Sequence, residues 1–366
     1  MVIRHGEVRH LRAPIQHVVK TAFGTMRERH ALFLILKDAD GHRGIGESWV
    51  NFPHWAPWER RAAYEQAIIP WLLQHPIDDI PTAMAQLYGA LRGPAQQSGS
   101  VGPLLSALCA VELALWDLAA QRAGVPLARL LYEHPRDRVR IYASGINSPL
   151  PWELIDEHLA HGAALFKLKL GFGDEEDRRN LAALRQHLGD HATIAVDVNR
   201  AWTLGQALEW LPILRDHQVA WLEEPLQVEQ ERHLPVLQGR GVAIAGGENV
   251  LMPPGSDPFL LAHTPVDILQ PDLTKYAPLH VAKQLLTAAR KAGKRLIPHF
   301  LGSAPGGAAL LHFAAGCDEG LLEWDINRNP LRTAFYATPF EIRDGMIPIP
   351  DRPGLGWSLE DVAWPD

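Results

Sequence analysis

The chain has few cysteines and no apolar leader. Only Cys109 and Cys317 occur among its 366 residues, too few for a disulfide framework and without the spacing of a cysteine metal site. Residues 1–7 are charged and contain no apolar core, so we expect no secretory signal. These absences argue against a disulfide-stabilised secreted protein and favour a reducing, cytoplasmic location.

Long uncharged runs and blocks of positive charge are missing as well. The longest weakly charged stretch, residues 101–120, contains Glu112 and Asp117 and is followed by Gly124, which is typical of a buried helix rather than a membrane span. The formal net charge is −7 with histidine neutral, and there is no long basic run. We therefore expect no nucleic acid and no membrane as a partner, and a small molecule instead.

Apolar residues are plentiful. They make up 47% of the chain, against 21% charged residues, which excludes disordered and low-complexity classes. At about 150 residues per domain the length allows two or three domains, although one barrel takes roughly 200 or more. We predict a soluble globular protein with a large core.

The first third of the chain mixes strand and helix patterns. An apolar run, a turn at residues 40–41 and a second short run predict an antiparallel sheet, and two stretches with helical periodicity follow. The predicted segments are strands over 31–36 and 44–48, helices over 59–74 and 81–92, and a loop over 93–100. We thus predict an α+β domain over residues 1–135.

From residue 138 onward, short apolar runs alternate with amphipathic helical stretches. The runs are 141–143, 165–170, 194–198, 219–222, 242–245, 266–269, 295–297 and 321–324. Eight strands, each followed by a helix, predict a (β/α)8 TIM-like barrel over residues 136–339. An open doubly wound sheet is the alternative, but the first run lacks the Gly-x-Gly-x-x-Gly turn that usually follows there. We expect residues 340–366 to pack back on the N-terminal domain, which caps the barrel.

Ionisable residues stand at the carboxyl ends of seven of these runs, where a barrel places its chemistry. From the third run to the eighth, their spacings are 26, 25, 24, 27 and 24 residues, the near-constant step that one strand and one helix produce. In chain order they are Lys167 and Lys169, Asp197, Glu223, Glu248, Asp272, His299 and Glu323. Charges at strand ends are common, but seven successive matches favour a site.

The first of these groups combines two lysines with three carboxylates. Strand alternation puts Lys167 and Lys169 on one face, toward the barrel mouth, where ammonium groups need anions. Asp197, Glu223 and Glu248 lie on three consecutive strands and would repel one another without a cation. Oxygen ligands favour Mg²⁺, with Mn²⁺ as the alternative, over Zn²⁺. A charge-paired network with the lysines, without a metal, is the other interpretation.

The second group is Asp272 and His299, on neighbouring strands across the ring. A carboxylate beside an imidazole fixes its tautomer and raises its basicity, as in a general base. The sequence has no Gly-x-Ser-x-Gly elbow, no phosphate loop and no paired histidines on the first run. A cation flanked by two bases suits removal of a proton next to a carboxylate, because the cation stabilises the enediolate.

At these residues the sequence resembles the enolase superfamily and, within it, the mandelate racemase subgroup. The resemblance covers almost the whole chain. Residues 110–118 with 124–127 resemble the signature that joins the family's capping domain to its barrel, and residues 353–356 resemble its C-terminal motif. The pair Asp272 and His299 is unlike the muconate-cycloisomerase-like subgroup, which has a lysine near the end of the sixth strand.

The resemblance implies roles for the first group of residues. It implies that Asp197, Glu223 and Glu248 bind Mg²⁺, that Lys169 is one base, and that Lys167 helps to neutralise the substrate carboxylate. We also expect the neighbouring Lys167 and the cation to lower the pKa of Lys169 toward neutrality, so that it can accept a proton.

The resemblance also implies roles on the opposite side. His299, oriented by Asp272, is expected to be the base or acid on the other face of the substrate. Glu323 is expected to hydrogen-bond the developing enediolate, and Asn199, which strand alternation pairs with Asp197, is expected to contact the substrate. Relatives often have an Arg and a Gly pair shortly after the aspartate, whereas this chain has Lys275 in place of that Arg.

Two reactions share this machinery. If a β-hydroxyl leaves with help from His299, the enzyme is a dehydratase of a sugar acid, a lyase, which is our prediction. If the α-carbon is reprotonated from the opposite face, it is a racemase or epimerase of a 2-hydroxy acid such as a mandelate-like substrate. A barrel that only binds its ligand is a third alternative, which the intact set of ligands and bases disfavours.

The sequence says less about substrate choice and assembly. Two loops, residues 20–27 with Phe23 and residues 49–58 with several aromatic residues, are expected to select the substrate. They do not decide between a polyhydroxy acid and an aromatic hydroxy acid. We expect a homo-oligomer, because relatives commonly form symmetric assemblies.

Overall fold

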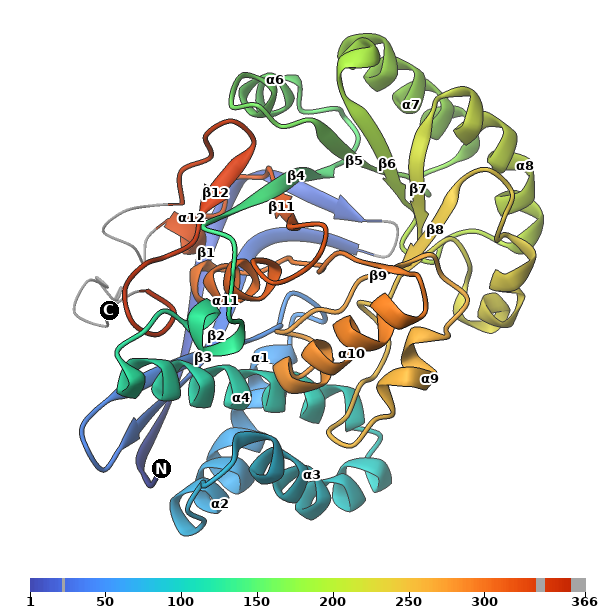
Figure 1. The fold of residues 1–366 in the computed structure, drawn as a ribbon. Coiled ribbons are helices and arrows are strands. Elements are labelled where there is room, and N and C mark those ends of the chain that lie inside the picture. Colours follow the sequence, from blue (N-terminus) through green and yellow to red (C-terminus); the bar gives the residue numbers. More distant parts are fainter. Residues whose placement is uncertain (22–23, 334–339, 357–366) are drawn as a thin grey trace.

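The computed structural model describes residues 1–21, 24–333 and 340–356. An N-terminal domain of sheet and helices lies against a curled parallel sheet that is ringed by helices (Figure 1). This arrangement confirms the predicted fold class, a (β/α)8 barrel with an α+β N-terminal domain.

The N-terminal domain is a three-stranded antiparallel sheet packed against helices. Its strands are β1 (Ile3–Thr21), β2 (Gly24–Asp38) and β3 (Arg43–Ser48), with β2 in the centre. The helical segments are α1 (Ala56–Ala63), a π-helical turn (Tyr64–Ile68), α2 (Ile69–Gln74), α3 (Ile80–Gln97), α4 (Val101–Ala123) and α5 (Leu127–Leu131). Strand β1 was not predicted, because arginine and histidine residues interrupt its apolar positions.

Strand β2 connects the two cores of the molecule through its alternating side chains. Phe33 and Ile35 belong to the large apolar cluster that includes the barrel, whereas Leu32, Leu34 and their neighbours pack against the N-terminal helices. One face of the N-terminal sheet therefore belongs to the same apolar cluster as the barrel, and the other face belongs to a cluster with the N-terminal helices.

Strand β3 lies directly on α4. A Cβ atom on Gly46 would stand 1.8 Å from the carbonyl oxygen of Ala110, and one on Gly44 would stand 2.2 Å from that of Ala114. Only glycine allows this approach. Helix α4 is long and apolar enough to cross a membrane, but 78% of the apolar window is buried inside the protein.

The loop predicted over residues 93–100 is wrong, because α3 continues to Gln97. Pro94 stands close to the end of the helix, so its missing N–H removes only one helical bond. The carbonyl of Pro94 then accepts hydrogen bonds from the backbone N–H and the Oγ of Ser98, both at 3.1 Å, which end the helix.

The barrel has eight parallel strands in sequence order around a ring, with the eighth beside the first. They are β4 (Arg138–Ile146), β5 (Leu165–Lys169), β6 (Thr193–Asp197), β7 (Val219–Glu223), β8 (Ala243–Gly246), β9 (Ile268–Leu269), β10 (Arg295–Leu296) and β11 (Leu321–Asp325). A separate apolar cluster with Tyr142, Trp221 and Ile268 fills the interior, as expected for a packed barrel.

Helices surround the barrel with one exception. They are α6 (Trp152–Ala160), α7 (Asp174–Leu188), α8 (Leu204–Asp216), α9 (Pro258–Ala262), α10 (Leu279–Lys291), α11 (Ala304–Ala314) and α12 (Pro330–Thr333). A short 3₁₀ turn (Gly189–His191) follows α7. The expectation of a helix after every strand is wrong after β7, where a 3₁₀ segment (Val228–Val236) contains Pro235 and buries none of its residues. Because no residue of this segment is buried, an α-helix here would gain little stability from packing against the sheet.

The described part of the tail contacts both domains. Strand β12 (Met346–Pro348) pairs antiparallel with β4 of the barrel, whereas the N–H of Leu355 donates to Asp117 Oδ1 of α4 at 2.8 Å. Residues 357–366 of the predicted tail lie outside the described residues, and the domain boundaries stay a prediction.

Candidate active site

The ionisable residues predicted at the strand ends meet at the mouth of the barrel. Lys169 stands beside Asp197 in the register of β5 and β6, and Asp197 stands beside Glu223 in that of β6 and β7. Because parallel strands end at one level, residues far apart in the sequence become neighbours here.

Lys167 lies at the centre of the carboxylates. Its side chain is fully buried, and its Nζ lies 2.5 Å from Glu223 Oε1, 2.8 Å from Glu323 Oε1 and 3.6 Å from Asp197 Oδ2. Burial alone would lower the pKa of Lys167, but the attraction of these carboxylates raises it well above its usual value. Lys167 is therefore a fixed positive charge.

Lys169 is held by Asp197 and Asn199. Its Nζ forms an ion pair with Asp197 Oδ2 and donates to Asn199 Oδ1 at 3.0 Å. Burial lowers the pKa of Lys169, but the attraction of Asp197 raises it above its usual value. Lys167 lowers the pKa of Lys169, as expected, although Asp197 outweighs it; the expected effect of the cation stays a prediction.

The carboxylates are strongly perturbed by burial. Burial raises the pKa of Glu223 to about 8, with Lys167 opposing the shift, and burial together with Glu248 raises the pKa of the adjacent Glu224 to about 7. Glu248 behaves differently. Burial opposes its ionisation, but His299 Nε2, 2.7 Å from its Oε2, lowers the pKa of Glu248 well below its usual range.

The charges around the mouth fit a bound cation. Six carboxylates are buried here, and five basic side chains contact them. The carboxylates are Asp197, Glu223, Glu224, Glu248, Asp272 and Glu323; the basic side chains are Lys167, Lys169, Arg200, Lys275 and His299. A group of buried carboxylate oxygens suits a hard divalent ion such as Mg²⁺.

The three predicted metal ligands do not form one tight group in this structure. Their oxygens pair with Lys169, Lys167 and His299 instead. Within the described residues, the only set of at least three His, Cys, Asp or Glu side chains with ligand atoms inside 4.8 Å is Asp38, Asp40 and His42. That set stands at the turn between β2 and β3, where Asp38 accepts two backbone N–H groups and pairs with Arg122.

The predicted pair of Asp272 and His299 is formed. Asp272 Oδ2 lies 2.8 Å from His299 Nδ1, and its Oδ1 accepts the N–H and the hydroxyl of Thr274, both at 2.7 Å. Because the carboxylate accepts, Nδ1 carries a proton and Nε2 faces the cavity side. Burial would lower the pKa of His299, but Glu248 and Glu323 raise it well above its usual value.

Glu323 is held by several donors. Ser144 Oγ and Tyr142 Oη donate to its two oxygens, and Lys167 lies 2.8 Å from Oε1. Burial opposes its ionisation, but Lys167 and then His299 lower the pKa of Glu323. The predicted hydrogen bond from Glu323 to an enediolate needs a proton on this carboxylate, which Lys167 opposes.

A cavity of about 270 Å³ opens between these groups and the N-terminal domain. It is lined by Trp49, Phe52, Lys169, Asn199, Arg200, Glu224, Glu248, Asn249, Lys275, Tyr276, His299 and Leu301. Lys169 and His299 thus face one cavity from the second and seventh barrel strands.

The predicted specificity loops are only partly at this cavity. Trp49 and Phe52 line it, whereas Trp55 and Trp58 are about half exposed and do not. In the other loop, Phe23 lies outside the described residues.

Two cavity residues were not predicted as such: Asn249, and Lys275, which was expected only as a replacement for an arginine of relatives. Lys275 Nζ donates to Asn249 Oδ1 at 2.7 Å and lies 4.5 Å from the centre of the Trp49 ring. Asn249 Nδ2 also donates to Glu224 Oε2 at 2.8 Å. Asn249 directly follows Glu248, a carboxylate at the end of a strand. The same kind of position led to the prediction of Asn199, two residues after Asp197, so Asn249 could have been predicted in the same way.

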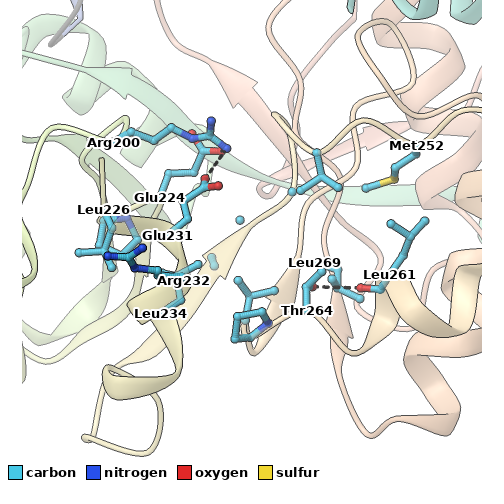
Figure 2. Close-up of a pocket in the computed structure, with 17 residues that line it drawn as sticks. Arg200, Glu224, Leu226, Glu231, Arg232, Leu234, Met252, Leu261, Thr264 and Leu269 are labelled. Atoms are coloured by element: carbon cyan, nitrogen blue, oxygen red, sulfur yellow. Dashed lines mark hydrogen bonds and ion pairs between the residues drawn. The ribbon is translucent and has the colours of Figure 1, made fainter. Parts of the chain in front are cut away.

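A second pocket adjoins the first behind Arg200 and Glu224, which line both (Figure 2). Figure 2 shows Arg200 pointing toward Glu224 and Glu231; its Nη2 lies 2.7 Å from Glu231 Oε1. The rest of the wall is mostly apolar, with Leu226 and Met252 among its residues. An ion pair therefore separates this apolar pocket from the candidate active site.

Backbone strain is concentrated beside the same groups. Asn199, Arg200 and Glu224 have φ angles of 46°, 63° and 40°, in the left-handed region that residues other than glycine rarely adopt. Such strain often accompanies functional sites, because the surrounding structure must hold it in place.

Two models of one protein family together match most of the chain. Residues 4–131 match the family model of the mandelate racemase / muconate lactonizing enzyme N-terminal domain, and residues 153–363 match the enolase C-terminal domain-like model. A D-galactarolactone cycloisomerase of Agrobacterium fabrum is 32% identical over 95% of each chain. An L-talarate/galactarate dehydratase of Salmonella typhimurium is 31% identical over 90% of this chain and 80% of that enzyme.

A solved crystal structure has a similar fold. The crystal structure of a racemase from Streptomyces coelicolor with bound magnesium has a TM-score of 0.85 and 25% identity, and the match covers 98% of both chains. Other relatives are named as sugar-acid dehydratases and as epimerases. The chain is therefore an enzyme and belongs to the mandelate racemase / muconate lactonizing enzyme family of the enolase superfamily.

Proposed function

We propose that this enzyme removes the α-proton of a sugar acid and then eliminates a β-hydroxyl group, as a Mg²⁺-dependent dehydratase. The observation that supports this most is that Lys169 at the end of β5 and His299 after β10 line one cavity, beside a set of buried carboxylates. Two proton-transfer groups and a group of carboxylate oxygens that can hold a cation are what this chemistry requires.

The proposed metal ligands are Asp197, Glu223 and Glu248. Magnesium binding is typical of the family, and the buried oxygen set here suits it. A bound Mg²⁺, or Mn²⁺ as the alternative, would supply positive charge that stabilises the enediolate. Lys167, a fixed cation next to Glu223, would hold a carboxylate oxygen of the substrate.

The chain's own residues would move the protons. Lys169 would accept the α-proton from one face as the neutral amine, after its ammonium group has released a proton to solvent. His299 Nε2, with Nδ1 held by Asp272, would protonate the leaving hydroxyl on the other face. Glu323 would contact the enediolate beside Lys167.

The polar side chains in the cavity favour a polyhydroxy acid. Asn199, Asn249 and Lys275 offer hydrogen-bonding groups, beside the aromatic rings of Trp49, Phe52 and Tyr276. The hydroxyl groups of a polyhydroxy acid can hydrogen-bond to these polar side chains, whereas an aromatic ring cannot.

A racemase or epimerase of a 2-hydroxy acid is the second candidate. Two proton-transfer groups line the cavity, Lys169 and His299, and they could deprotonate one face and reprotonate the other. A cytoplasmic location suits the two free, buried cysteines, Cys109 and Cys317. We also propose a homo-oligomer, which light scattering of the purified protein would test.

The deciding experiment screens mono- and diacid sugars and 2-hydroxy acids with Mg²⁺ in deuterated water. Deuterium at the α-carbon reports proton abstraction, a keto-acid product reports dehydration, and polarimetry reports racemisation. Lys169→Ala and His299→Asn together should abolish all three, whereas Lys283→Ala, a lysine on α10 outside the cavity, should abolish none. Activity that survives exhaustive chelation, or the double substitution, would exclude this chemistry; a barrel that binds an acid without exchange would support the ligand-binding alternative.

A further inference from the structure

The end of strand β3 reaches from the N-terminal domain into a barrel loop that follows His299. The side chain of Glu47 is buried, and its carboxylate accepts three hydrogen bonds from this loop. The donors are Ser303 N at 2.8 Å, Ser303 Oγ at 2.6 Å and Gly306 N at 2.8 Å. Glu47 thus binds the start of α11 from another domain, where free N–H groups and the helix dipole favour an anion.

The loop is closely wrapped around this carboxylate. Ser303 is the N-cap residue of α11 but makes no capping bond of its own, so Glu47 takes that role. A Cβ atom on Gly302 or Gly306 would lie 2.9 or 2.8 Å from a Glu47 oxygen. Only three residues lie between His299 and Ser303, so a shift of this loop would move the backbone that carries the imidazole.

Two residues after Glu47, the same segment holds the partner of His299. The N–H of Trp49 donates to the carbonyl of Thr274 at 2.8 Å, and Thr274 donates twice to Asp272 Oδ1. Asp272 Oδ2 in turn faces His299 Nδ1. The segment from Glu47 to Trp49 therefore contacts the loops of both members of the pair, while the Trp49 ring lines the cavity.

We propose that Glu47 is a positioning residue, which sets the orientation of the His299 imidazole against Asp272 from the N-terminal domain. This inference rests on the proposed function, in which His299 transfers a proton. Glu47 touches neither the cavity nor the carboxylates proposed as metal ligands, and it acts only through the loop and His299.

The test is a double-mutant cycle. Glu47→Gln keeps the shape of the side chain but turns an amide group toward N–H donors, so it loses at least one of the three bonds. We expect kcat for the His299-dependent reaction to fall about 10- to 100-fold, as for other residues that orient a reacting group, with KM changed less than about twofold. In a His299→Asn background, Glu47→Gln should cause no further loss of the α-proton exchange that Lys169 carries out.

The matched control is Asp117→Asn. Asp117 is also a buried carboxylate of the N-terminal domain with three N–H donors, but its partners are Ile45, Gln121 and Leu355, away from His299. This substitution should leave the ratio of His299-dependent to Lys169-dependent rates unchanged. The proposal would be overturned if Glu47→Gln lowered the rate of α-proton exchange equally in the wild-type and His299→Asn backgrounds. It would also be overturned if Asp117→Asn changed the ratio of the two rates.

A spectroscopic measurement separates this inference from the proposed function. The hydrogen-bonded Nδ1–H proton of His299 can be assigned by NMR through its absence in His299→Asn. Glu47→Gln should shift or remove this signal and Asp117→Asn should not, whether or not a substrate has been found; an unchanged signal overturns the proposal. If Glu47→Gln does not fold, Thr274→Val takes its place. It removes the hydroxyl that donates to Asp272 and should shift or remove the same Nδ1–H signal, whereas Thr274→Ser keeps a hydroxyl and should keep the signal.

Discussion

A buried ion pair joins the N-terminal domain to the end of the eighth barrel strand. Arg29 on β2 donates to Asp325 Oδ2 on β11, and the two side chains are 2% and 4% exposed. The other oxygen of Asp325 accepts the N–H of Asn327 at 3.0 Å. Arg29→Met keeps an apolar stem of similar length but leaves the Asp325 charge buried without its main partner.

The magnitude follows from this burial. Breaking a buried pair by removing one partner costs about 3–5 kcal/mol, so we expect the free energy of unfolding to fall by about that much at pH 7. With a urea m value of about 3 kcal/mol/M, the unfolding midpoint should fall by roughly 1 to 1.7 M. The exposed pair of Arg290 and Asp318, with side chains 47% and 63% exposed, supplies the control, since Arg290→Met should cost no more than about 1 kcal/mol.

The difference should also depend on pH. Burial raises the pKa of Asp325, but Arg29 outweighs it and lowers the pKa below the ordinary 3.8. The stabilisation is therefore present above about pH 4 and disappears as the pH falls through the lower folded-state value. Urea midpoints of wild type and Arg29→Met should converge in acid. A midpoint shift below about 0.3 M at pH 7, or a difference that stays constant into acid, would refute this reasoning.

Three further predictions concern the metal, a buried carboxylate and a glycine. Mg²⁺ at about 100 times its Kd should stabilise the protein by about 2.7 kcal/mol in thermal unfolding, and Asp197→Asn should lose most of this gain; equal gains would contradict the ligand assignment. Burial raises the pKa of Asp117 from 3.8 to about 6, so protonation favours the folded state and stability should be lost as the pH rises from about 4 to 6, by up to about 3 kcal/mol. Urea titrations at several pH values should show that Asp117→Asn removes this pH dependence. The same dependence of unfolding free energy on pH in wild type and variant would disprove the prediction. Gly46→Ala should destabilise by about 1–3 kcal/mol or more, because its Cβ meets the Ala110 carbonyl, whereas Gly89→Ala on α3, with open space around it, should be neutral or stabilising.

The elements that sequence reasoning placed well are those with a local signal. The barrel strands were predicted within a few residues, because each is a short apolar run bounded by turns and because one strand and one helix recur about every 25 residues. The misses have local reasons too: β1 lacks a clear apolar alternation, and α3 passes through Pro94 near its end.

The spacing of the ionisable residues along the chain was enough to predict that they share the barrel mouth, because strand alternation and the common level of parallel strand ends follow from local rules. Their pairing could be seen only in the folded protein. The ion pair of Asp197 with Lys169, the contact of Lys275 with Asn249, and the hydrogen bonds of Glu47 to the loop after His299 all depend on atoms brought together from distant parts of the chain. Electrostatic attraction and hydrogen bonding act over a few ångströms, and such distances are set by packing rather than by sequence separation.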